Sequence, residues 1–143
     1  MYDVDKLLSG DANEGLISRV PVPQGNMRQL NAGYHDIYAA YDPATKRDRF
    51  YGAGTGGFHV FDITHPEQPK FLFSLSGGPG VISYGHTLAP SNDGRYAMAF
   101  SEIQYWPVLV FDLKPGLEGQ VSSISSPIGG WTADWRGASH SGV

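Results

Sequence analysis

Short β-prone runs, several with alternating apolar and polar residues, follow one another along this chain. Alternation is clearest at residues 36–41 and 58–63. Similar runs occupy residues 15–23, 49–51, 70–75, 87–89, 96–101, 108–113, 120–124 and 131–135. Alternation with a period of two is typical of strands that bury one face. The pattern predicts an all-β protein, in which residues 4–9 are the only stretch that suggests a helix.

Turn-forming residues separate the runs. The chain has 19 glycines and 10 prolines among its 143 residues. Ser91-Asn92-Asp93-Gly94 predicts a hairpin, because Asn, Asp and Gly tolerate the positive φ that tight turns need. Short strands with turns at such intervals are typical of a sandwich, a barrel or a propeller.

An internal repeat favours the propeller. An aromatic residue followed by aspartate ends a strand-like run at Asp62 and at Asp112, and Tyr2-Asp3 carries a remnant of the same signature. A histidine opens the unit upstream of each full copy, at His35 and His86, and His140 follows after a similar interval of about 50 residues. An ordinary β-sandwich with chance similarity is the alternative.

Each unit has the size of a propeller blade, because four antiparallel strands fit into about 50 residues. The sequence therefore predicts a partial β-propeller of about three blades. Its parts are a blade remnant at 1–33, a blade at 34–83, a blade at 84–130 and the start of another at 131–143. We expect further blades from a longer polypeptide or from partner chains, because an open arc leaves sheet edges unpaired.

A resemblance to a known family supports this prediction. Residues 56–70, GGFHVFDITHPEQPK, resemble the LVIVD repeat, and residues 109–124 match it in part. Residues 86–100, HTLAPSNDGRYAMAF, are similar to a hairpin found in such propellers. The resemblance implies a β-propeller and a periplasmic or extracellular location, since the family consists mostly of exported or surface proteins. The chain's own start lacks the pattern of a signal peptide.

Composition and charge exclude several classes of protein. Aromatic residues make up 13% of the chain and charged residues 17%, which argues against disorder. The formal net charge of −4 argues against a nucleic-acid partner. No apolar run is long enough to cross a membrane. The absence of cysteine excludes disulfides and cysteine-ligated zinc.

One glycine-rich segment matches a nucleotide-binding pattern. Residues 52–57, GAGTGG, fit G-x-G-x-x-G. A dinucleotide site needs a helix after these glycines, whereas residues 58–63 alternate as a strand. The segment is therefore interpreted as a hairpin, and no nucleotide cofactor is expected.

The histidines are the metal-capable residues of the sequence. Equivalent residues at blade starts lie near a propeller's central channel, so His35, His86 and His140 are able to form a ring that binds zinc or copper. The favoured alternative is that each histidine bonds the backbone of a neighbouring blade, in which case no cofactor is needed. Asp36 could orient an imidazole in either case.

Other polar and aromatic residues have structural and functional interpretations. Asp62 and Asp112 are expected to cap the turns that follow their strands. Glu102 lies among aromatic residues, where a carboxyl group can serve as acid or base. With Tyr105 and Trp106 it forms a candidate surface for a partner or ligand, although blade cores also use such rings.

Three functions stay open at this stage. The leading hypothesis is a non-catalytic propeller scaffold that binds a protein partner, because no convincing catalytic set occurs in the sequence. The alternatives are a metal-dependent enzyme or oxidoreductase with a histidine ring, and a carbohydrate-binding propeller.

Overall fold

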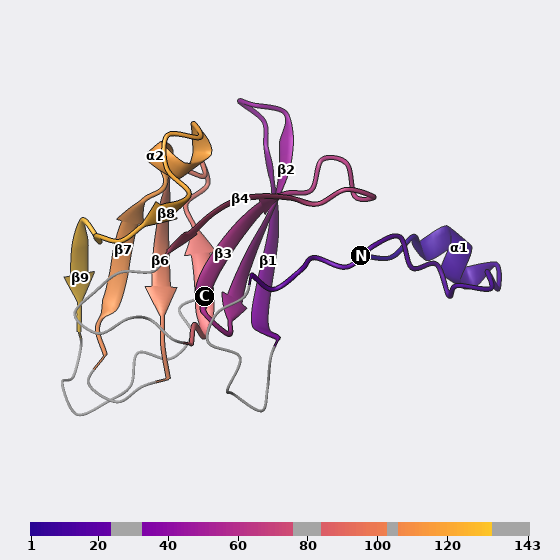
Figure 1. The fold of residues 1–143 in the computed structure, drawn as a ribbon, viewed down its shortest axis with the longest axis horizontal. Helices are drawn as coiled ribbons and strands as arrows, with labels where there is room; N and C mark the ends of the chain where they lie inside the picture. The colour runs from indigo at the N-terminus through magenta and orange to yellow at the C-terminus, as the bar shows by residue number, and fades with distance from the viewer. Residues whose placement is uncertain (24–32, 76–83, 103–105, 133–143) are drawn as a thin grey trace.

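A computed structural model describes residues 1–23, 33–75, 84–102 and 106–132. The strands form two sheets that lie beside each other (Figure 1). The first sheet has the order β1 (Tyr34–Asp42), β2 (Arg47–Gly54), β3 (Gly57–Asp62), β4 (Lys70–Leu75) and β8 (Ser123–Ile124). The second has the order β5 (Thr87–Pro90), β6 (Tyr96–Phe100), β7 (Val108–Asp112) and β9 (Gly129–Trp131). The predicted all-β class is confirmed.

The glycine-rich segment is a hairpin, as predicted. Gly54 pairs with Gly57 across a turn formed by Thr55 and Gly56, and β3 follows at once. Gly56 and Gly57 have φ values of 81° and 106°, which side chains rarely tolerate. Gly54 serves a different need, because a Cβ there would collide with the carbonyl oxygen of Gly33.

The hairpin predicted at Ser91-Asn92-Asp93-Gly94 joins β5 to β6. The Ser91 amide donates to the Tyr96 carbonyl over 2.8 Å, and Gly94 has a φ of 68°. The aspartates also behave as predicted. Asp62 accepts from the Thr64 amide over 2.9 Å, and Asp112 accepts from the Lys114 amide over 3.0 Å. The side chains thus cap the turns after β3 and β7.

The same interactions recur at corresponding ends of the two sheets. Asp62 forms an ion pair with Arg47 over 3.1 Å, and Asp112 forms one with Arg95 over the same distance. The next amide in each chain segment, that of Ile63 or Leu113, donates back to the start of the preceding strand. The two sheets can therefore be compared strand by strand.

The main core lies between the facing sheets. The first sheet contributes Tyr51, Ala53, Phe58, Val60, Phe73 and Leu75. The second sheet, with the residue that follows β7, contributes Leu88, Ala97, Ala99, Leu109, Phe111 and Leu113. Phe111 is fully buried in this core. Phe61 precedes its aspartate in the same way, but packs between Phe50 and Phe71 on the opposite face of the first sheet.

Several expected elements differ from the structure. The fourth strand of the second sheet is β9, which contains Trp131, and not residues 120–124. Within that stretch only β8 is a strand, and it pairs in parallel with β4 of the first sheet. A short helix, α2 (Lys114–Leu117), precedes it. These pairings are long-range, so the local alternation of residues could not reveal them.

The N-terminal segment is not the end of a propeller strand. Tyr2 and Leu16 form only an isolated bridge. Asp3 begins helix α1 (Val4–Leu8) by accepting from the Lys6 amide over 3.1 Å. The arm with α1 extends away from both sheets (Figure 1). No helix in the described part of the chain is long and apolar enough to cross a membrane.

Candidate metal centre

His35 and His86 lie next to each other where the two sheets meet. His35 is on β1, and His86 immediately precedes β5. Their ring centroids are 4.2 Å apart, with the ring planes tilted by 43°. Asp36 pairs with Ala53 on β2, and Thr87 pairs with Phe100 on β6, so the residues after the two histidines occupy corresponding places on the first strands.

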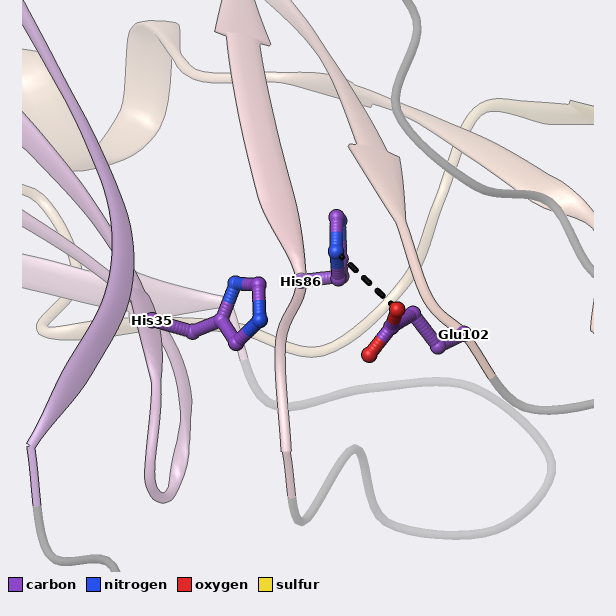
Figure 2. Close-up of side chains that lie close together, drawn as sticks. All are labelled: His35, His86 and Glu102. Atoms are coloured by element: carbon purple, nitrogen blue, oxygen red, sulfur yellow. Dashed lines mark ion pairs between the residues drawn. The ribbon is translucent and has the colours of Figure 1, made fainter.

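Glu102 completes the cluster from the end of β6. The amide of His86 donates to the Phe100 carbonyl over 3.0 Å, and this pairing places Glu102 beside the imidazole. The distance from His86 Nε2 to Glu102 Oε1 is 3.4 Å. Figure 2 shows His86 between His35 and Glu102 in this view. One ligand atom from each of the three residues lies within 4.8 Å of the others.

A hydrogen-bond chain determines which nitrogen of His86 carries the proton. The Thr87 hydroxyl donates its single proton to Asp36 Oδ2 over 2.9 Å. His86 Nδ1 lies 2.9 Å from the same hydroxyl oxygen. Since that oxygen has already donated its proton, it accepts here, and Nδ1 of His86 is the donor. In the neutral imidazole, the lone pair is therefore at Nε2.

The orientation of His86 has an electrostatic consequence at Glu102. The lone pair of Nε2 faces a carboxylate oxygen, which is also an acceptor. Two facing acceptors repel each other unless a cation lies between them. A proton or a metal ion between the two atoms meets this need.

The geometry suits a small divalent metal ion. Bonds of about 2.0–2.2 Å in a tetrahedral arrangement separate ligand atoms by roughly 3.3–3.6 Å. The separation of 3.4 Å between His86 Nε2 and Glu102 Oε1 lies in that range. His35 and Glu102 are exposed, so rotation of their side chains can bring the third ligand atom into place, while buried His86 anchors the site.

The remaining histidines have other positions. His59 is buried, and its ring nitrogens contact the Ser74 hydroxyl over 2.8 Å and the Thr55 carbonyl over 3.0 Å. Burial lowers the pKa of His59, which favours the neutral ring. His65 is exposed in the loop between β3 and β4. His140, the predicted third member of the ring, lies outside the described residues.

The structure brings Glu102 next to a residue that the sequence analysis did not group with it, and the ligand surface expected at Glu102, Tyr105 and Trp106 stays a prediction. Sequence reasoning grouped Glu102 with Tyr105 and Trp106 as a ligand surface, whereas the structure places its carboxylate beside His86. Trp106 packs against the main core, and Tyr105 lies outside the described residues. The antiparallel pairing of β5 with β6 was the signal for Glu102, because it brings the residues flanking the hairpin together.

A second polar cluster lies at the opposite end of β1. Arg49, although almost fully buried, forms a 2.7 Å ion pair with Asp42. The Thr45 hydroxyl donates to Asp42 over 2.6 Å. Hydrogen bonds from Thr45, together with the charge of Arg49, hold the pKa of Asp42 below its usual range. This cluster joins β1 to β2 and has no metal-ligand set.

Comparisons with protein-family models, with curated proteins and with solved structures find no match to this chain.

Proposed function

We propose that this chain binds a divalent transition-metal ion through His35, His86 and Glu102. The observation that carries the proposal is the 3.4 Å approach of His86 Nε2 to Glu102 Oε1. The Asp36–Thr87 hydrogen bond supports it, because that bond directs the lone pair of His86 toward the carboxylate. The first strands of both sheets are needed to assemble the site.

The chemistry of the ligands points to zinc, with copper as the competitor. Two imidazoles and one carboxylate are a ligand set of catalytic zinc sites, which keep the fourth position for water or substrate. Copper(II) binds nitrogen and oxygen ligands more tightly than zinc does, so availability decides between them. Because His35 and Glu102 are exposed, a metal here retains an exchangeable position. This ligand set supports the metal-dependent alternative, with two histidines and a glutamate in place of a ring of three histidines.

Calorimetric titration of the purified, chelator-treated chain with Zn²⁺ tests the proposal. We expect one zinc ion per chain, and we expect His86→Gln to weaken binding at least about 100-fold through loss of a ligand. His65→Gln is the matched control, since it removes an exposed histidine from a loop outside the cluster. Equal affinities of the wild type and His86→Gln would overturn the proposal.

A scaffold function is the second candidate, and a different observation favours it. The outer face of the second sheet exposes apolar side chains, including Met98 and Trp131. Such a face suits the docking of another sheet, as in a larger propeller. In that case the metal site and the docking surface belong to one propeller. The resemblance to exported propellers suggests that this chain acts in the periplasm or outside the cell.

A further inference from the structure

The two faces of the second sheet have different surroundings. One face carries Ala97, Ala99, Leu109 and Phe111, all buried against the first sheet. The other face carries a row that crosses the strands. Strand register places Ala89 beside Met98 and Met98 beside Val110. Met98 is 44% exposed, which is unusual for the middle of a central strand.

In the first sheet, the equivalent row of residues is covered by the second sheet. Arg49 pairs with Asp62 and Tyr96 pairs with Asp112, so counting from these pairs matches Met98 to Tyr51. Val110 matches Val60 by the same count. Tyr51 is only 2% exposed and Val60 is fully buried, because the second sheet packs over them. The row of Ala89, Met98 and Val110 on the outer face of the second sheet thus corresponds to the row of Tyr51 and Val60 in the first sheet. In the first sheet, that row is covered by the second sheet.

The first sheet also presents the surface that would cover it. Its outer face corresponds to the face of the second sheet that carries Phe111. Strand register aligns Ala39, Phe50, Phe61 and Phe71 across this face. Phe50 and Phe61 are already buried within one copy, whereas Phe71 is 39% exposed. Ile37, beside Gly52 on the same face, is 61% exposed. The part of this face that is open to a second copy is therefore formed by Ile37 and Phe71.

We propose that the outer face of the second sheet binds the outer face of the first sheet in a second copy of this chain. The contact uses the same two kinds of face as the interface between the two sheets of one copy, at their exposed residues Met98, Ile37 and Phe71. It is a heterologous contact, which leads to a closed ring when the rotation per copy allows closure. With two sheets per chain and about four to eight in a closed propeller, a ring takes about two to four copies. The proposal is independent of the metal site.

Two charge-introducing variants test the contact from its two sides. Met98→Glu alters the outer face of the second sheet, and Ile37→Glu alters that of the first. Both residues are exposed within one copy, so each variant should retain the fold. Leu8→Glu is the control, because Leu8 lies on the α1 arm and is 80% exposed.

Light scattering coupled to size exclusion measures the outcome over about 5–500 µM protein, a range that brackets micromolar dissociation constants. We expect the wild type and Leu8→Glu to exceed the monomer mass of 15.5 kDa as concentration rises. Met98→Glu alone and Ile37→Glu alone should stay monomeric. Mixed together, they should form a dimer, because each supplies the face that the other has lost.

Two results would overturn the proposal. A wild type that stays monomeric throughout the range shows that no copy binds this face. An Ile37→Glu variant that dimerises alone shows a symmetric contact between two second sheets, or contact with another surface. Circular dichroism of each variant verifies that a change in mass does not come from loss of the fold.

Discussion

Replacing Thr87 with valine should weaken metal binding without removing any ligand. The Thr87 hydroxyl accepts from His86 Nδ1 and donates to Asp36, at 2.9 Å in both cases. Valine keeps the branched shape but removes both hydrogen bonds. The proton of neutral His86 can then move to Nε2, the nitrogen that faces Glu102.

The size of the expected loss in zinc affinity follows from the position of Thr87, which contacts the proposed ligand His86 at the nitrogen that does not face Glu102. Loss of a group that orients a metal-bound histidine typically costs 10–100-fold in affinity, or about 1.4–2.7 kcal/mol. The metal-free protein should lose about 1 kcal/mol of stability through the missing hydrogen bonds. That loss affects the free and the metal-bound chain alike, so the change in affinity measures the orientation of His86 separately.

Two assays check this prediction. Calorimetric competition gives the zinc affinity of Thr87→Val, of Thr87→Ser, which keeps the hydroxyl, and of Thr64→Val, which removes a turn hydroxyl elsewhere. Nitrogen NMR of the metal-free chain at about pH 8.5, where histidine is ordinarily neutral, should show the proton of His86 on Nδ1. A wild type with that proton on Nε2, or a Thr87→Val variant with unchanged affinity, would refute the reasoning.

Three further predictions concern the fold. Gly54→Ala should lower the unfolding free energy by about 1–3 kcal/mol, since its Cβ would collide with backbone, whereas Gly129→Ala meets nothing within 4 Å and should be neutral in urea unfolding. Phe111→Ala should cost about 3–5 kcal/mol in the same assay, because its ring is fully buried; a loss below 1 kcal/mol would contradict its core position. The depressed pKa of Asp42 stabilises the fold above the ordinary aspartate pKa of about 3.9, and this stability disappears as pH falls through the lower folded value. Unfolding measured from about pH 6 to pH 2.5 should therefore change less in Asp42→Asn than in the wild type; equal changes would exclude this contribution.

Local chemistry determined much of the fold from the sequence alone. The hairpin at Gly54–Gly57, the turn at Ser91-Asn92-Asp93-Gly94 and the caps by Asp62 and Asp112 each depend on residues close together in the chain. Positive φ and side-chain to backbone bonding are properties of those residue types. The alternation of residues likewise sufficed for the all-β class, because the side-chain period of a strand is itself local.

The histidine pair was also accessible to the sequence, through its spacing. His35 and His86 open units of similar length, and the structure brings their rings together at the first strands of the two sheets. The third ligand was not accessible in this way. Glu102 reaches His86 only through the pairing of β5 with β6, and its sequence neighbours suggested an aromatic surface instead.

Only the tertiary structure decided which strands share a sheet and which side chains form hydrogen bonds with each other. β8 joins the first sheet and β9 the second through contacts that no local pattern specifies. The Thr87–Asp36 hydrogen bond joins residues 51 positions apart, and it directs the lone pair of His86 toward Glu102. Residue types and spacing therefore indicated a histidine pair, whereas the packing of two sheets determined its orientation, because hydrogen-bond geometry depends on positions in space.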